Sequence, residues 1–445
     1  MKIAYICADQ GVPVLGHKGA SVHVREFTDA LVELGHEVRI YGAAGAAKDG
    51  QCANQNRARA TLTILAPSKL TNDAAKLFAT SLSRLGWKHD TAYLFSEVQH
   101  LLADPAFVTA ALPLLHDFAP ELLIARHALF SLAGLEMART LGCPCVLEVN
   151  APLVEERRRY WGLTLQQEAE QAERTAFAGA DLLVAVSEEL STYLLHYGAS
   201  RDRIVVLPNG VNLARFHPAV DGAGMRRHYG LEGQVVLGFT GSLKPWHGVD
   251  MLLRAFADVQ TALRQRTPSC EQKETALHLL IIGDGPQREV LMRLSHELGV
   301  SKQVTFTGAL PHAELPAHLA VFDIAVAPYL FSDEFYFSPL KVMEYLAMGR
   351  AIVAPRLGQL PALLQGVDGP CGLLYRADDH QDLARALLQL ISDEELRRVL
   401  GIRAAEQAQQ HYSWQRVALH IIARACALPT VHNAQKQHLS QVVQT

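Results

Sequence analysis

Short apolar runs alternate with helical segments along most of the chain. Residues 2–8 form the first apolar run, and a glycine-containing loop follows over residues 11–19. Residues 21–34 then place apolar side chains at helical spacing up to a glycine, and residues 38–41 form a second apolar run. This order predicts a strand–helix–strand unit, in which parallel strands are covered by helices on both faces.

The same pattern recurs in two sets, separated near residues 208–211. The expected strands are 122–125, 145–149, 182–186 and 204–207 in the first set, and 235–239, 277–282, 304–307, 324–327 and 351–354 in the second. The fold class predicted is α/β, with two Rossmann-like, doubly wound domains over residues 1–212 and 213–411. The charged and polar residues 264–275 indicate a surface loop, and the Gln-rich residues 432–445 a polar tail.

Composition narrows the function classes. The 445 residues are 49% hydrophobic and 19% charged, which excludes a mostly disordered chain. The chain has 41 Lys and Arg and 45 Asp and Glu, which gives a net charge of −4. This charge argues against a nucleic-acid-binding groove but not against a nucleotide ligand. Seven cysteines, an odd number without zinc spacing, favour reduced thiols and a cytoplasmic location.

No targeting or membrane-spanning segment is expected. Residues 1–7 are too short and too β-branched for a signal peptide, and charged residues or prolines interrupt the apolar stretches. Peripheral contact with the inner face of a membrane stays open. The mixed-charge segment 155–160 is interpreted mainly as a solvated face, with contact to an anionic acceptor or a membrane as the alternative.

A candidate anion site lies at residues 335–349. Ser338 suits a helix N-cap, Pro339 the first helical position and Gly349 the C-terminal stop. The N-terminus of such a helix can bind a diphosphate, and Glu344 could accept two hydrogen bonds from a ribose diol. The alternative is an amphipathic helix with a solvated glutamate.

With these residues the chain resembles the retaining glycosyltransferases of family 4, which have the GT-B fold of two Rossmann-like domains facing across a cleft. Their motif is a glutamate, seven residues and a second glutamate. Glu344 matches the second, and residues 349–354 match the segment after it. Tyr336 stands at the position of the first glutamate, and Glu334 is out of register. The motif without the first glutamate, together with residues 337–341, resembles a recurrent subgroup of the family.

The resemblance extends to residues 238–250, which follow the first strand of the second domain. The family has an arginine after the glycine matched by Gly241 and a lysine before the one matched by Gly248, whereas this chain has Ser242 and His247. We therefore predict that Lys244 stabilises the departing diphosphate, with His247 as a second donor. The alternative is a surface lysine in a turn.

Further donor contacts are implied by the resemblance. They are the backbone amides of Phe337, Ser338 and Leu340, the turn glycines Gly283 and Gly285, and the strand end at Thr307 and Gly308. A tight turn without a ligand is the alternative for the glycines. No Asp-x-Asp motif and no His/Asp cluster at metal spacing occurs, so a metal-free mechanism without a cofactor is expected.

The first domain is expected to bind the acceptor. The loop glycines Gly16 and Gly19 allow close approach to the donor, and His127 is the candidate active-site histidine. The candidate acceptor ligands are His17, Lys18, Arg126, Glu148 and Asn150. A solvated loop is the alternative for residues 16–19.

The segment 206–212 resembles the interdomain motif of the family, and a helix at about 412–430 is implied to cross back onto the first domain. The resemblance implies a glycosyltransferase that moves a sugar from a nucleoside-diphosphate sugar, with UDP favoured over GDP. Transfer would retain the anomeric configuration, as in a hexosyl transferase. The acceptor could be a small molecule, a glycan or a lipid-linked sugar. A nucleotide-sugar epimerase and a non-catalytic nucleotide-sugar-binding subunit remain as alternatives.

Overall fold

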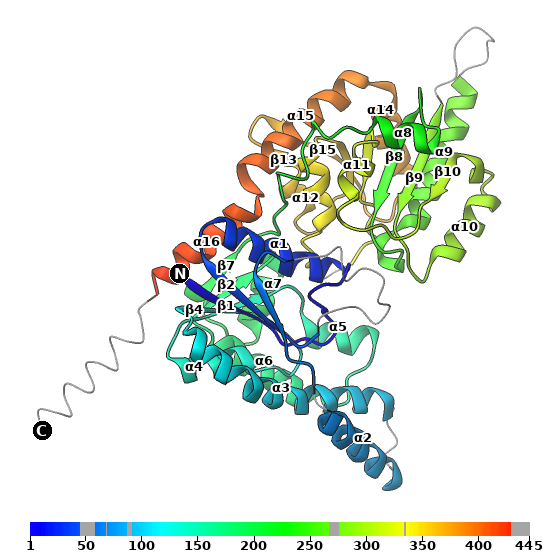
Figure 1. The fold of residues 1–445 in the computed structure, drawn as a ribbon. Helices are drawn as coiled ribbons and strands as arrows, with labels where there is room; N and C mark the ends of the chain where they lie inside the picture. Colours follow the sequence, from blue (N-terminus) through cyan, green and yellow to red (C-terminus); the bar gives the residue numbers. More distant parts are fainter. Residues whose placement is uncertain (45–57, 68, 87–90, 267–275, 333–334, 429–445) are drawn as a thin grey trace, which may run out of the picture. The chain divides into compact units, whose positions relative to one another are not determined.

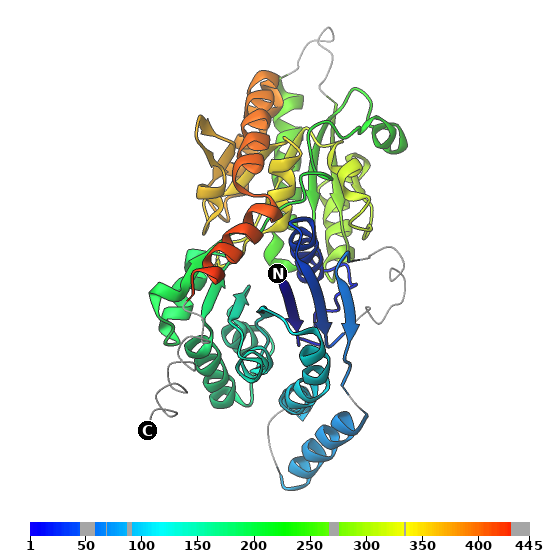
Figure 2. The same cartoon turned by 60° about the vertical axis from the view of Figure 1, so that its left-hand side comes forward.

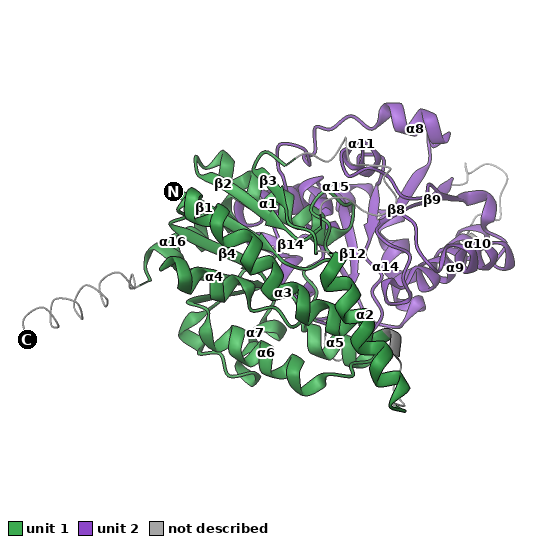
Figure 3. Cartoon of the chain, turned by 60° about the horizontal axis from the view of Figure 1, so that its bottom comes forward, with its two compact units in different colours: residues 1–208, 336–338, 414–445 green, residues 209–335, 339–413 purple. Residues whose placement is uncertain are grey.

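The computed structural model describes residues 1–44, 58–67, 69–86, 91–266, 276–332 and 335–428. The chain forms two compact units (Figure 3). Unit 1 consists of Met1–Pro208, Tyr336–Ser338 and the described part of Trp414–Thr445, and unit 2 of Asn209–Phe335 and Pro339–Ser413. The first change of unit thus comes four residues before the boundary expected after residue 212. The expected polar tail, 432–445, lies outside the described residues.

Unit 1 is built on a seven-stranded parallel sheet with the strand order β3-β2-β1-β4-β5-β6-β7. Its strands are β1 (Lys2–Cys7), β2 (Glu37–Gly42), β3 (Thr61–Ile64), β4 (Leu122–Arg126), β5 (Cys145–Val149), β6 (Leu182–Ala185) and β7 (Ile204–Val206). The edge strand β3 is not predicted from the sequence. It is only four residues long and partly exposed, so it lacks a buried apolar run.

Helices cover both faces of this sheet (Figure 1). They are α1 (Gly19–Glu33), α2 (Lys69–Arg84), α3 (Thr91–Phe118), α4 (Ala133–Leu141), α5 (Leu153–Tyr160), α6 (Gln166–Gly179), α7 (Glu188–His196) and α16 (Trp414–Cys426). The last of these packs against α1, where the Trp414 ring meets the edge of His23 at 4.9 Å between centroids. Helix α2 extends beyond the sheet and packs against α3 (Figure 2).

Within the described ranges, one helical stretch has the length and apolarity of a membrane span, Tyr93–Phe118 of α3. One third of its most apolar window is buried, and the helix packs against α2 and α4. It contains two prolines, Pro105 and Pro113. A core helix of a globular domain meets the same criterion of length and composition, so the stretch carries little weight as a membrane span.

Unit 2 contains a six-stranded parallel sheet with the order β10-β9-β8-β11-β12-β15. Its strands are β8 (Val235–Thr240), β9 (Leu277–Ile282), β10 (Val304–Phe306), β11 (Ile324–Val326), β12 (Ala351–Pro355) and β15 (Gly372–Tyr375), with a separate hairpin of β13 (Gln365–Gly366) and β14 (Gly369–Pro370). Strands β13, β14 and β15 are not predicted from the sequence, since glycines interrupt them.

The helices of unit 2 lie on both sides of its sheet (Figure 1). They are α8 (Ala223–Tyr229), α9 (Val249–Arg266), α10 (Arg288–Glu297), α11 (Leu315–Leu319), α12 (Leu340–Ala347), α13 (Leu360–Leu363), α14 (His380–Ser392) and α15 (Glu394–His411). Helix α9 continues to Arg266, so the first part of the loop expected over residues 264–275 is helical. Residues 267–275 lie outside the described residues.

Strand β8 packs closely against the buried ring of Phe322. Gly238 lies in β8 directly beneath the buried ring of Phe322, and a Cβ atom at Gly238 would lie 2.2 Å from the ring. The glycine therefore permits close packing of Phe322 on the sheet.

We expect Gly238→Ala to lower the free energy of unfolding by about 1–3 kcal/mol, because the added methyl group overlaps a buried ring in a close-packed core. Urea denaturation measures the change. The control is Gly224→Ala in α8, where no atom lies within 4 Å of the added Cβ and the helix should gain about 0.5–1 kcal/mol. Equal stability of the two variants would contradict the packing argument.

Candidate active site

In unit 2, three loops are joined by backbone hydrogen bonds at the carboxyl edge of the sheet. The Gly241 N–H donates to Ile282 O at 2.9 Å, the Leu243 N–H to Asp284 O at 2.9 Å, and the Gly283 N–H to Gly308 O at 2.9 Å. These bonds bring together loops that carry the predicted donor-site residues Ser242, Gly283, Gly285, Thr307 and Gly308. Gly241 anchors the first of these loops.

The glycines of the second loop have a packing reason. Gly283 has φ +139°, and a Cβ atom there would lie 1.9 Å from Gly241 O. A Cβ atom at Gly285 would lie 2.7 Å from the backbone of Leu243. The loops can therefore approach one another only with glycine at these positions. Direct contact of Gly283 or Gly285 with a ligand stays a prediction.

Glu344 is buried, at 7% exposure, on a helix that is buried almost all round. Its Oε1 lies 2.8 Å from Nε2 of His312, which follows β10 and packs against the ring of Phe216. Among the described residues none bonds to Oε2. The solvated glutamate of the alternative interpretation is thus excluded, and one oxygen is left for a ligand. His312 is absent from the sequence prediction, because its position after Pro311 matches no motif.

The start of α12 differs from the prediction. Pro339 is extended, with ψ 114°, so the helix begins at Leu340, and no side chain caps it. The prediction of Ser338 as the N-cap is therefore wrong. By their contacts residues 336–338 belong to unit 1 and Leu340 to unit 2, and phosphate binding by the amides of Phe337, Ser338 and Leu340 stays a prediction.

Tyr336 occupies the position expected for the first glutamate of the motif. Its ring is buried in the main core of unit 1, and its hydroxyl donates to Glu156 of α5. The side chain at this position is therefore bound within unit 1, next to Phe337, whose ring lies 4.4 Å away between centroids. Glu334 lies outside the described residues.

The two predicted cationic donors of unit 2 are not equivalent. Lys244 is half-buried, with Nζ 4.7 Å from the centroid of the Trp246 ring. His247 donates from Nδ1 to the Ser242 carbonyl, and burial, aided by the charge of Lys341, lowers the pKa of His247 to about 3. A neutral imidazole that uses its Nδ1 proton in this way has only a lone pair at Nε2. The second donor role of His247 therefore stays a prediction with no support from this geometry.

Lys341 is a cation that the sequence prediction missed. It is buried, and its Nζ lies 4.1 Å from the Phe239 ring centroid and 5.0 Å from that of Tyr329. Burial lowers the pKa of Lys341 to about 7, although Glu344 acts in the opposite direction. A usable signal was present, because Lys341 and Glu344 are three residues apart and so share one face of α12.

In unit 1, the predicted active-site histidine is held by a buried acid. His127 directly follows β4, and its Nε2 lies 2.9 Å from Oε1 of Glu173 on α6, which is fully buried. The Tyr193 hydroxyl donates to the other oxygen of Glu173. The buried Nδ1 of His127 has no partner among the described residues. Glu173 was missed, since nothing in the sequence of α6 distinguishes it.

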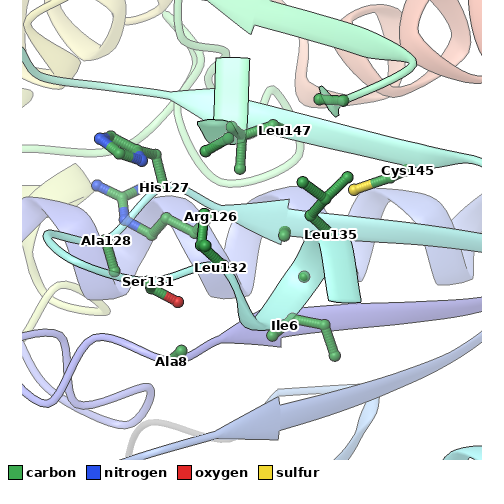
Figure 4. A pocket seen from close by; sticks show the side chains of 14 residues that line it. Ile6, Ala8, Arg126, His127, Ala128, Ser131, Leu132, Leu135, Cys145 and Leu147 are labelled. Atoms are coloured by element: carbon green, nitrogen blue, oxygen red, sulfur yellow. The ribbon is translucent and has the colours of Figure 1, made fainter. Parts of the chain in front are cut away.

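A small pocket lies beside His127 and is lined by residues of β1, β4 and β5 and of the segment that follows β4. Figure 4 shows the side chains of Arg126 and His127 next to each other, with Leu135, Leu147 and Cys145 lining the apolar part. Arg126 Nη1 and the Nδ2 of Asn150 are buried without a hydrogen-bond partner in the described chain. The same holds for Nε and Nη2 of Arg157 on α5.

Glu148 is committed to the interior of unit 1. It is buried and accepts a hydrogen bond from the Tyr5 hydroxyl at 2.5 Å, and its second oxygen lies 3.3 Å from His23 Nε2. Burial opposes ionisation, but His23, Tyr5 and the charge of Arg126 together hold the pKa of Glu148 below its usual value. Both oxygens have protein partners, so an acceptor contact by Glu148 stays a prediction with no support from this geometry.

The loop before α1 presents its predicted ligands to solvent. His17, Lys18 and Gly19 are exposed, whereas Gly16 is buried. The buried Arg25 fixes this loop by donating from Nη1 to Val14 O at 2.5 Å and Gly16 O at 2.6 Å. Among the described residues, no cluster of three or more His, Cys, Asp or Glu side chains is arranged to hold a metal ion.

Comparison with known proteins identifies two family models, one in each half of the chain. "Glycosyltransferase Family 4" matches residues 17–215, and "Glycosyl transferases group 1" matches residues 234–393.

Similar proteins include D-inositol 3-phosphate glycosyltransferases. That of Nocardia farcinica is 34% identical over 60% of this chain and 57% of its own length, and that of Pseudarthrobacter chlorophenolicus is 27% identical over 96% and 92%. A GDP-mannose-dependent α-(1-6)-phosphatidylinositol monomannoside mannosyltransferase of Mycolicibacterium smegmatis is 33% identical over 47% of this chain and 52% of its own. The chain thus spans little more than half the length of the Nocardia and Mycolicibacterium relatives.

Solved structures share the fold. HepE of Anabaena, in complex with UDP and glucose, superposes with a TM-score of 0.69 at 18% identity, covering 96% of this chain and 100% of that one. Sucrose-phosphate synthase of Thermosynechococcus elongatus gives a TM-score of 0.68 at 19% identity over 99% and 100%. With the two family models, this likeness places the chain among the glycosyltransferases of family 4, which have the GT-B fold.

Proposed function

We propose that the protein transfers a hexose from a nucleoside-diphosphate sugar to an acceptor, with retention of the anomeric configuration and without a metal ion. The observation that carries the proposal is the carboxylate of Glu344, which is buried and fixed through one oxygen by His312. Its other oxygen is unbonded by any described residue, as a ligand for a ribose diol requires. Burying such a group without a ligand is unfavourable, which favours a binding role.

UDP is the proposed nucleotide, and GDP is the alternative to be tested. A relative is named as GDP-mannose-dependent, and the HepE structure contains UDP and glucose. In the proposed site the base lies along the backbone at Thr307 and Gly308, where side chains distinguish the bases little. The nucleotide must therefore be identified by measurement.

The proposed reaction is same-face substitution, in which the donor phosphate helps to deprotonate the acceptor hydroxyl. His127 is the candidate group of unit 1. Because Glu173 accepts a hydrogen bond from Nε2, a neutral His127 ring carries its proton there and presents a lone pair at Nδ1. That nitrogen would accept a hydrogen bond from a sugar hydroxyl and so orient the reactants.

The function is tested by incubating the protein with UDP- and GDP-hexoses, candidate acceptors and a chelator, with the product configuration read by NMR. We expect transfer with retention. Inversion, or loss of activity that magnesium restores, would contradict the proposal. An epimerised donor without acceptor would instead indicate an epimerase, and binding without turnover a non-catalytic subunit.

We expect Glu344→Ala to weaken UDP or GDP binding by a factor of roughly 10 or more, since hydrogen bonds to a charged group are worth about 1.5–3 kcal/mol each. Isothermal titration calorimetry measures the affinity. Glu297→Ala is the matched control, because Glu297 is an exposed glutamate at the end of α10. Unchanged affinity in a folded Glu344→Ala protein would exclude the ribose role.

The acceptor is proposed to carry a phosphate group. Relatives are named as inositol phosphate and phosphatidylinositol mannoside transferases. Unit 1 offers buried N–H groups without partners on Arg126, Asn150 and Arg157. A planar guanidinium matches the geometry of phosphate oxygens, so a phosphate would satisfy donors that the described chain leaves unpaired.

Contact with the cytoplasmic face of a membrane is proposed through α2. The side chains of Leu70, Leu77 and Phe78 on this helix are 78%, 69% and 48% exposed. Because Leu77 and Phe78 follow Leu70 by seven and eight residues, the three lie on one face of the helix. Lys69 and Lys76 are exposed one position before the leucines. A basic helix with exposed apolar side chains suits an anionic lipid surface.

Transfer to soluble inositol phosphate and to vesicles containing phosphatidylinositol separates these two proposals. We expect Arg157→Met to lower both rates by roughly tenfold or more, because a charge-assisted bond to phosphate is lost. Leu77→Asp should lower only transfer to vesicles. Arg158→Met, at an exposed neighbour on α5, is the control. A normal rate for Arg157→Met contradicts the phosphate role, and normal vesicle transfer for Leu77→Asp contradicts the membrane contact.

A further inference from the structure

A buried ammonium group without a hydrogen-bond partner lies beneath the loop after β8. Lys341 Nζ has no partner among the described residues and rests against the rings of Phe239 and Tyr329. Aromatic faces attract a cation but satisfy none of its three N–H donors. Leaving these donors unpaired destabilises the folded protein, so the position requires a reason other than stability.

The geometry shows where the ammonium group points. A Cβ atom at Gly241 would lie 2.7 Å from Lys341 Nζ, so the absence of a side chain there leaves the group next to the loop backbone. Lys341 also interacts with the ring of His247 on η2 (Pro245–His247). The ammonium group therefore lies beside the loop whose two expected cations are replaced by Ser242 and His247.

We propose that Lys341, reaching past Gly241 from α12, binds the diphosphate of the donor and supplies the positive charge that the motif has lost at Ser242 and His247. This inference rests on the proposed function, since it presumes a nucleoside-diphosphate ligand. It replaces Lys244 as the main cation of the site. The Lys244 ammonium group instead lies against the ring of Trp246.

The surroundings make Lys341 the group whose charge responds to the ligand near neutral pH. The titratable groups that face it are His247 from η2, Tyr329 after β11 and Glu344 on α12, with Lys244 near His247. His247 has a pKa of about 3 and burial raises that of Tyr329, so both stay neutral. Lys341, with a pKa of about 7, is half protonated at neutral pH.

The direction of the pH effect follows. A diphosphate binds the protonated form, so it raises the pKa of Lys341, and binding above pH 7 takes up a proton. The affinity is constant below the pKa of the free protein and falls as the pH rises above it. In the free protein, the buried charge of Lys341 lowers the free energy of unfolding by its full amount below about pH 7. This destabilisation decreases as the pH rises and is gone above the ordinary lysine pKa of about 10.4.

The test is calorimetric titration of UDP and GDP at about pH 8 in two buffers of different ionisation enthalpy. We expect the wild type to take up close to one proton. Lys341→Met should abolish this uptake and weaken binding at least tenfold at about pH 6.5, by loss of a charge-assisted hydrogen bond. The same substitution should raise the thermal stability of the free protein, because it removes an unpaired buried charge. A purely structural lysine would not give this combination.

Two comparisons complete the experiment. Lys302→Met, at an exposed lysine of η3 (Ser301–Gln303), should change nothing. Lys244→Met should leave the proton uptake intact. Unchanged affinity and proton uptake in folded Lys341→Met, or loss of both in Lys244→Met alone, would overturn the role of Lys341. Failure of the wild type to bind either nucleotide would overturn the proposed function together with this inference, and is recognised because it appears before any substitution.

Discussion

Parallel strand pairing is the constraint on which both units depend. When every strand of a sheet runs the same way, every carboxyl end arrives at one edge, and the segments that follow the strands must share that edge. In unit 2 those segments are joined further, backbone to backbone, from Gly241 through Gly283 to Gly308. The loops therefore form a rigid support, and side chains from neighbouring elements complete it.

The polar groups at these edges fall into two kinds. Glu148 is surrounded by Tyr5 and His23 and stabilises the interior of unit 1. Arg126, Arg157 and Lys341 carry buried N–H groups that no described residue accepts. Because an unpaired buried donor costs about 1–3 kcal/mol, the second kind lowers the stability of the folded chain unless a ligand accepts these hydrogen bonds.

Most of the fold was predictable, because buried parallel strands are continuous apolar runs of characteristic length. Strands β5 and β9 have the predicted bounds, and most others differ by a residue or two. Strands β3 and β15 were missed, since an edge strand and a glycine-containing strand lack that pattern. Motifs led to His127 and Glu344, whereas their partners Glu173 and His312 come from distant segments and carry no local signal. Lys341 was missed because the prediction of cations followed the family motif in the loop 241–248, whereas this lysine lies on α12.

The chain passes between the units four times, after Pro208, Phe335, Ser338 and Ser413. The brief return at 336–338 contributes Tyr336 to the core of unit 1, and α16 covers α1. A chimera that replaces everything after residue 208 with the corresponding part of a relative would remove both. Unit 2 can therefore be exchanged intact only as two separate segments, 209–335 and 339–413, rather than as a contiguous half. Recombination would have to preserve all of their junctions to yield a folded hybrid.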